Sequence, residues 1–121
     1  MDISTNYIFN INGKEEFDRL ALSIFQFQAE HNIVYSSYLK ALNISPDKIF
    51  EIKDIPFLPV EFFKYHKIIT SESKERKPEV VFLSSGTSGI QQSRHYVLDK
   101  SFYEKSFIKG FEQFYGNIKE Y

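Results

Sequence analysis

The apolar positions near the start of the chain repeat with the spacing of an α-helix. Asn12, followed three residues later by Glu15, has the pattern of a side-chain cap with an acid in the first helical turn. The segment that follows therefore predicts an amphipathic helix over about 14–30. Its apolar positions are Phe17, Leu20, Ala21, Ile24 and Phe27.

Shorter helical stripes and prolines follow. Apolar residues at helical spacing predict a second helix over 35–42. Pro46 predicts one further helical turn, because proline is favoured at the first helical position. Two prolines within 54–59 fix an extended segment. A helix is expected to restart over 60–67, so residues 1–70 are predicted to be mainly helical.

The second half of the chain shows strand patterns. Mixed charges and a proline in 71–79 predict a solvated loop. The β-branched and aromatic run from Val80 to Leu83 predicts a buried strand, and 94–98 predicts the strand that returns. Residues 79–98 are therefore expected to form a strand–loop–strand hairpin.

A last helix is predicted over 99–116. Ser101 with Glu104 forms the better capping box at its start, with Asp99 as the alternative, and Gly116 is a natural stop. Aromatic residues at helical spacing were assigned to the core, namely Phe62, Phe63, Phe111 and Phe114. The expected fold class is α+β in one domain over 1–121: a helical N-terminal half, a hairpin and a C-terminal helix.

Composition narrows the class of protein. The chain has 121 residues, 42% hydrophobic and 26% charged, with 15 basic and 16 acidic side chains. This argues against disorder and against a basic nucleic-acid-binding face. It contains no cysteine, which excludes disulfides, thiolate metal ligands and cysteine nucleophiles and fits a cytoplasmic location. No signal peptide and no apolar run that could span a membrane are recognisable. Thirteen Phe and eight Tyr are an unusual excess.

The loop between the two predicted strands is the segment that carries chemistry. Its residues are Ser84, Ser85, Gly86, Thr87, Ser88 and Gly89. Glycines expose backbone N–H groups and hydroxyls add donors, so the loop can form a nest for phosphate oxygens. It lacks the lysine and the strand-to-helix setting of a Walker loop, and no dinucleotide fingerprint is present. From composition alone, a plain surface turn is the alternative.

Residues 82–89 resemble the signature loop of adenylate-forming acyl synthetases, Ser/Thr-Ser-Gly-Ser/Thr-Thr/Ser-Gly. The family pattern continues with proline and lysine, where this chain has Gln91 and Gln92. The proline-rich segment 55–59 with the pair Phe63-Lys64, and Ser93-Arg94-His95 after the loop, are similar to the acyl-protein synthetase (LuxE-type) and phenylacetate-CoA ligase-like branch.

This resemblance implies an ATP- and Mg-dependent ligase. A carboxylic acid, a fatty acid in this branch, would form an acyl-adenylate and pyrophosphate, and a thiol on a protein or CoA would then take the acyl group. By position, Ser84, Ser85, Thr87 and Ser88 would donate hydroxyls to the phosphates, and Gly86 and Gly89 would permit the turn. Arg94 could replace the missing lysine, and the family places a histidine near His95. Both also read as ordinary surface or packed polar residues. No catalytic residue and no metal ligand were identified.

The family's adenine, ribose and magnesium ligands lie downstream of this loop. The chain is therefore expected to be the N-terminal portion of a larger ligase, without adenylation activity by itself. Its aromatic excess would then form an exposed surface for the remaining portion or for a second copy. Two alternatives stay open: a small non-catalytic helical interaction domain, and nucleotide binding without catalysis.

Overall fold

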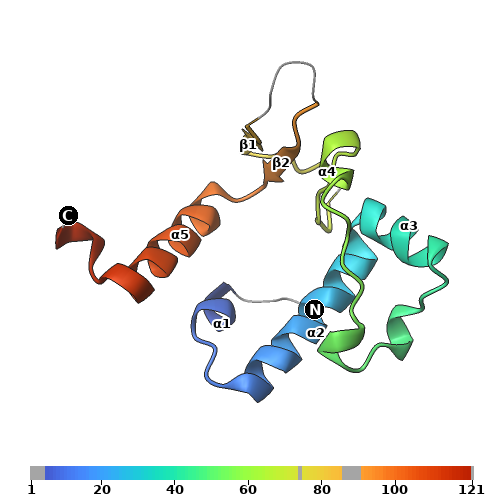
Figure 1. The fold of residues 1–121 in the computed structure, drawn as a ribbon, viewed down its shortest axis with the longest axis horizontal. Helices are drawn as coiled ribbons and strands as arrows, with labels where there is room; N and C mark the ends of the chain where they lie inside the picture. The colour runs from blue at the N-terminus through green and yellow to red at the C-terminus, as the bar shows by residue number, and fades with distance from the viewer. Residues whose placement is uncertain (1–4, 74, 86–90, 121) are drawn as a thin grey trace.

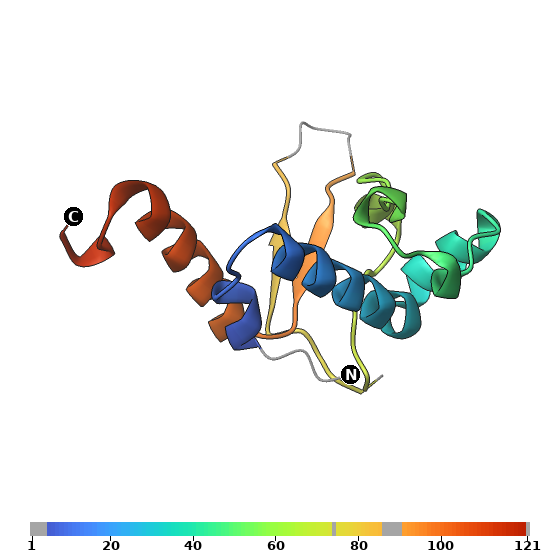
Figure 2. The same cartoon turned by 90° about the horizontal axis from the view of Figure 1, so that it is seen from below.

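The computed structural model describes residues 5–73, 75–85 and 91–120. Helices from the first half of the chain form one body, a two-stranded hairpin lies beside it, and a long C-terminal helix leads away (Figures 1 and 2). The α-helices are α1 (Thr5–Phe9), α2 (Lys14–His31), α3 (Ile33–Ala41), α4 (Phe62–Tyr65) and α5 (Lys100–Tyr115). Short 3-10 turns are η1 (Pro46–Lys48), η2 (Ile52–Asp54) and η3 (Ile118–Glu120), and the strands are β1 (Val80–Leu83) and β2 (Arg94–Val97).

Helix α2 confirms the helix predicted over 14–30, but its cap differs from the prediction. The N-cap position is Gly13, at φ 95°, a conformation that favours glycine. Asn12 does not cap through its side chain. Instead its backbone N–H donates to the Glu16 carboxylate at 3.0 Å, so the acid that reaches back is Glu16 and not Glu15.

One buried asparagine joins α2 to α3 and holds the returning chain. Asn32 is 6% exposed, and its Oδ1 accepts the Tyr35 N–H at 2.9 Å, which caps α3. Its Nδ2 donates to the Thr70 hydroxyl at 3.0 Å. Ser71 N–H donates to the His31 carbonyl at 3.1 Å in the same place. Residues 70 and 71 are therefore fastened to the α2–α3 corner.

The core lies between α2, α3 and the extended segment that follows. The buried residues of this cluster are Phe25, Ala29, Tyr35 and Leu39, and the side chains packed against them are Tyr38, Ile44, Ile49, Ile55 and Leu58. Phe25 meets Tyr35 edge to face, with ring centroids 6.1 Å apart. The Tyr35 hydroxyl donates to the Pro56 carbonyl at 2.6 Å, which fixes the proline segment on the helices.

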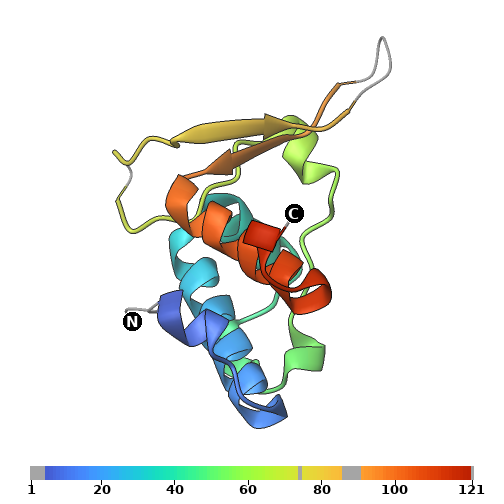
Figure 3. The ribbon, with the colours of Figure 1, turned by 90° about the vertical axis from the view of Figure 1, so that its left-hand side faces the viewer.

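The hairpin has the two predicted strands, but not the predicted burial. β1 and β2 are antiparallel, with Leu83 opposite Arg94 and Phe82 opposite His95. Val81 is 42% exposed and Leu83 57% exposed, so the expectation of a buried strand is wrong. The physical reason is that β1 has one strand neighbour in the described part of the chain, and helices cover one face of the sheet (Figure 3).

Helix α4 is shorter than the segment 60–67 predicted from sequence, and it packs against β2. Phe62 and Phe63, which were assigned to the core, are half-buried. Phe62 meets the Tyr38 ring at 5.4 Å, which ties α4 to α3.

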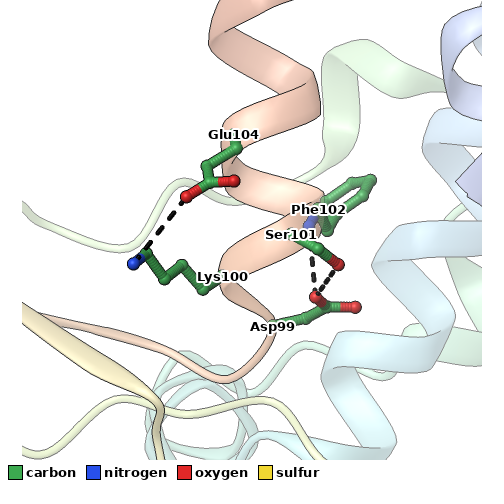
Figure 4. A network of polar contacts seen from close by, with 5 residues as sticks. All are labelled: Asp99, Lys100, Ser101, Phe102 and Glu104. Carbon is green, nitrogen blue, oxygen red and sulfur yellow. Dashed lines mark hydrogen bonds and ion pairs between the residues drawn. The ribbon is translucent and has the colours of Figure 1, made fainter.

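Asp99 caps helix α5, so the preference for Ser101 as its cap is wrong. Asp99 Oδ1 accepts the Phe102 N–H at 3.1 Å and the Ser101 hydroxyl at 2.6 Å (Figure 4). Glu104 forms an ion pair with Lys100 at 3.8 Å rather than completing a capping box. Gly116, at φ 82°, ends the helix as predicted.

The aromatic stripe of α5 does not form a core in the described residues. Phe114 is 78% exposed and Phe107 is 51% exposed, while Phe111 is half-buried beside Tyr115, with ring centroids 5.0 Å apart. The assignment of Phe114 to the core is therefore wrong. None of the helices among the described residues has the length and apolarity needed to cross a membrane.

The packing of Leu39, which is 1% exposed, makes a prediction about stability. Leu39→Ala is expected to lower the free energy of unfolding by about 2–5 kcal/mol, because it leaves a cavity among fixed neighbours. Urea denaturation followed by circular dichroism measures the loss. Leu42→Ala, at a side chain that is 46% exposed, is the control and should cost much less. Equal losses would contradict the placement of the core.

Candidate functional site

The stem of the Ser/Gly loop is closed by two serines. Beyond the last strand pair, Ser84 N–H donates to the Ser93 carbonyl at 3.0 Å. The Ser93 N–H donates back to the Ser84 hydroxyl oxygen at 2.9 Å. Ser93 is 7% exposed, so this closure is shielded from water. The two ends of the loop therefore start from a fixed separation.

Helix α4 contacts the stem through the strand that leaves the loop. The His95 ring stacks on Phe63, with centroids 4.7 Å apart and an interplanar angle of 26°. The same ring places Nε2 3.2 Å from the Ser93 hydroxyl. Gln91 Nε2 donates to the Lys64 carbonyl at 2.7 Å. The sequence pair Phe63-Lys64 thus meets the segment after the loop.

The structure separates the predicted site residues into three groups. Gly86, Thr87, Ser88 and Gly89 lie outside the described residues. Ser84 is half-buried and its oxygen is engaged within the stem, whereas Ser85 is exposed and adjoins it. The predicted phosphate donors that can be placed therefore have different surroundings, with Ser85 open to solvent.

Arg94 and His95 are not brought together. Neighbouring residues of a strand point to opposite faces, so His95 faces Phe63 while Arg94 lies on the other face. Arg94 is exposed and stands opposite Leu83. Tyr96 shares the face of Arg94, and Lys67 Nζ lies 5.4 Å from the Tyr96 ring centroid. Arg94 and Lys67 therefore lie at one face of the hairpin and the histidine on the other.

An open groove of about 850 Å³, which the sequence did not predict, lies between α2, the proline segment and the start of α5. Its walls come from segments far apart in the chain, so no local pattern marks it. Its lining is mainly apolar and includes Ile24, Phe27, Ile55, Leu58, Ile68 and Phe102. Phe63 also lines it, so α4 borders both the groove and the loop stem.

Polar side chains also line the groove. Arg76 and Asp99 are among them. The hydrogen bond from the Ser101 hydroxyl, with the Phe102 N–H next, lowers the pKa of Asp99, and the charge of Arg76 adds to this effect. Asp99 is therefore ionised at neutral pH. No group of three or more His, Asp or Glu side chains that could hold a metal occurs among the described residues.

Comparison with known proteins identifies similar sequences. Residues 8–105 match the sequence model of a family described as acyl-protein synthetase, LuxE. The match runs from the end of α1 to the start of α5 and includes α4 and the hairpin. A long-chain-fatty-acid–luciferin-component ligase of Photorhabdus luminescens is 37% identical over 73 residues, which are 60% of this chain and 60% of that protein. No solved structure matches.

The groove-lining Tyr35 gives a prediction about pH. Burial raises the pKa of the Tyr35 phenol above its usual value, and the neighbouring Tyr38 adds to the shift. The neutral form therefore stabilises the fold fully below about pH 10, and this contribution is lost as pH rises through the folded-state pKa. The free energy of unfolding should fall with pH above about 10, and less steeply in Tyr35→Phe.

Denaturation at a series of alkaline pH values measures this difference. Tyr65→Phe, at a ring that is 67% exposed, is the control and should keep the wild-type slope. Identical slopes for Tyr35→Phe and wild type would contradict the assignment.

Proposed function

Because residues 8–105 match its model, the chain belongs to the LuxE acyl-protein synthetase family, and we propose that it forms the phosphate-binding and acyl-binding part of an ATP-dependent ligase. The chain spans about 60% of the length of the curated relative that it matches. The activity of the whole protein is therefore part of the proposal. A carboxylic acid attacks the α-phosphate of ATP to form an acyl-adenylate and displace pyrophosphate. A thiol on a protein or CoA then attacks the acyl carbon, which forms a thioester and releases AMP.

The closed loop stem is the observation that carries this proposal. Ser84 and Ser93 hold the ends of the Ser/Gly loop together, and Ser85 is exposed where the loop begins. Donors held in place stabilise developing negative charge better than donors that must be ordered first. The exposed Ser85 hydroxyl next to the stem suits a phosphate oxygen, and Arg94 supplies a cation on one face of the hairpin. Mg²⁺ would enter with the nucleotide.

The groove supports an acyl chain as the other ligand. Its volume lies within the range of small-molecule sites, about 300–1,000 Å³, and its lining is mainly apolar. Each methylene moved from water into such a lining contributes about 0.8 kcal/mol. The name of the Photorhabdus relative specifies a long-chain fatty acid. We therefore place the acyl chain in the groove, with α4 between the chain and the loop stem.

The exposed aromatic residues are proposed to contact another part of the ligase. Phe82 meets Tyr103 at 4.8 Å and Tyr103 meets Phe107 at 5.7 Å, so an aromatic row runs from β1 along α5. All three side chains are more than a third exposed. The same row favours the second candidate, a non-catalytic interaction domain in which the Ser/Gly loop is a plain turn. A second copy of the chain, forming a homodimer, is a further candidate to cover this surface.

Nucleotide binding separates the two candidates. MgATP titrated into the 121-residue chain should shift the amide resonance of Ser85, because the loop contacts the phosphates. Ser85→Ala should weaken MgATP by about three- to tenfold, the effect of one hydrogen bond. The chain should show no acid-dependent ATP–pyrophosphate exchange by itself.

Ser37→Ala, at an exposed position of α3, is the matched control for this experiment. It should bind MgATP like wild type. If the wild-type chain binds no MgATP, the phosphate-binding part of the proposal fails and the interaction domain is favoured.

Acyl-chain length tests the groove. Calorimetry with saturated fatty acids of increasing length should show tighter binding by about fourfold for each buried methylene, following the transfer free energy of 0.8 kcal/mol. Ile24→Trp should weaken the longest acids most, because the indole fills the groove that Ile24 lines. Val60→Trp, at a side chain that is 74% exposed and does not line the groove, should have no effect. Affinity that is independent of length would refute the acyl site.

A further inference from the structure

Helix α4 contacts the segment after the loop at two separate points. The first is the hydrogen bond from Gln91 Nε2 to the Lys64 carbonyl, 2.7 Å long and spanning 27 residues of sequence. The second is the stack of His95 on Phe63. Both contacts lie on the segment that leaves the loop, Gln91 before β2 and His95 within it, and they flank Ser93, which closes the stem.

We propose that Gln91 and His95 are positioning residues, which use α4 to set the position of the loop ends for phosphate binding. This inference rests on the proposed function of the loop. Neither residue needs to touch the nucleotide. Gln91 fixes the point at which the chain leaves the loop, and His95 fixes the serine that ties the exit to the entrance.

The role of His95 follows from its hydrogen bond. The Ser93 hydroxyl is 3.2 Å from His95 Nε2, and the Ser93 N–H is bound to the Ser84 oxygen. With its hydroxyl held by His95, Ser93 keeps one rotamer and does not compete for the Ser84 oxygen. Phe63 holds the imidazole itself by ring stacking. A chain of contacts therefore links α4 to the stem: Phe63 holds His95, His95 holds Ser93, and Ser93 binds Ser84.

The contacts with α4 preorganise the loop stem before the ligand binds. A two-stranded hairpin is marginally stable without further packing. Here α4 supplies packing at the end of the hairpin that leads into the loop (Figure 3). A stem that is already ordered loses less conformational entropy when a phosphate binds beside it, and this strengthens binding without a new contact.

Two variants of the full 121-residue chain test the proposal, with MgATP as the probe. Gln91→Met keeps the length of the side chain and removes the donor to Lys64. His95→Phe keeps a ring that can stack on Phe63 and removes Nε2. Each should weaken MgATP by about tenfold, the effect of one hydrogen bond that orders the site. Gln92→Met makes the same chemical change at the exposed neighbouring position and should bind MgATP like wild type.

Amide hydrogen exchange supplies a readout that needs no nucleotide. In both variants the Ser84 and Ser93 N–H groups should exchange about tenfold faster, while Glu79 N–H, bonded to Val97 at the far end of the hairpin, should keep its wild-type rate. Unchanged exchange at both serines would overturn the proposal. Faster exchange with unchanged MgATP affinity would overturn it too, since the stem would then not position the phosphate site.

The phosphate-binding role of the loop and the positioning role of α4 are tested separately by these two measurements. If wild type does not bind MgATP but both serines exchange faster in the variants, the function proposed for the loop fails while α4 is shown to position the stem. If wild type binds MgATP and Gln91→Met and His95→Phe match Gln92→Met in both measurements, the positioning role fails and the function of the loop stands.

Discussion

The buried Asn32 is the constraint on which the arrangement of this chain depends. Its side-chain amide caps α3 and binds Thr70 from a segment 38 residues later, while its own extended backbone ends α2. A buried amide that lost these partners would remain desolvated without compensation. Because the returning chain is fastened there, residues 68–70 form a wall of the groove against α2. The proline segment is fixed in the same region through the Tyr35 hydroxyl.

The position of α4 follows from these two attachments. It lies between the proline segment and the fastened Thr70, so its place is set from both sides. Four helical residues would not hold a helix in water, since short isolated helices are marginal. Here Phe62 packs on α3 and Phe63 packs on the hairpin. A short element with aromatic contacts in two directions thereby joins the helical body to the strands.

The segments that α4 joins all lie within the region that matches the family. The acyl-protein synthetase match covers the corner, the proline segment, α4 and the hairpin together. These are the parts that place an apolar groove and the stem of the Ser/Gly loop next to Phe63. In contrast, residues after 105 lie outside the match and include the most exposed aromatic residues of α5, Phe114 and Tyr115.

The sequence by itself determined the local features of this protein. Helical periodicity located α2 and α3, the β-branched run located β1, and Gly116 marked the end of α5, because each depends on neighbours within a few residues. The resemblance carried by the loop led to the same family as the comparison did. Capping was less predictable, since Asp99, Ser101 and the acids Glu15 and Glu16 offer similar local chemistry.

Only the tertiary structure decided which apolar residues are buried and what surrounds the loop. The same aromatic character appears in Phe25 and Phe114, yet one is 3% and the other 78% exposed, because burial depends on which segments meet. The groove and the contact of Gln91 with Lys64 join distant positions, so no pattern along the chain contains them. The sequence pattern located the Ser/Gly loop, and the packing of α4 determined which contacts hold the residues at its ends.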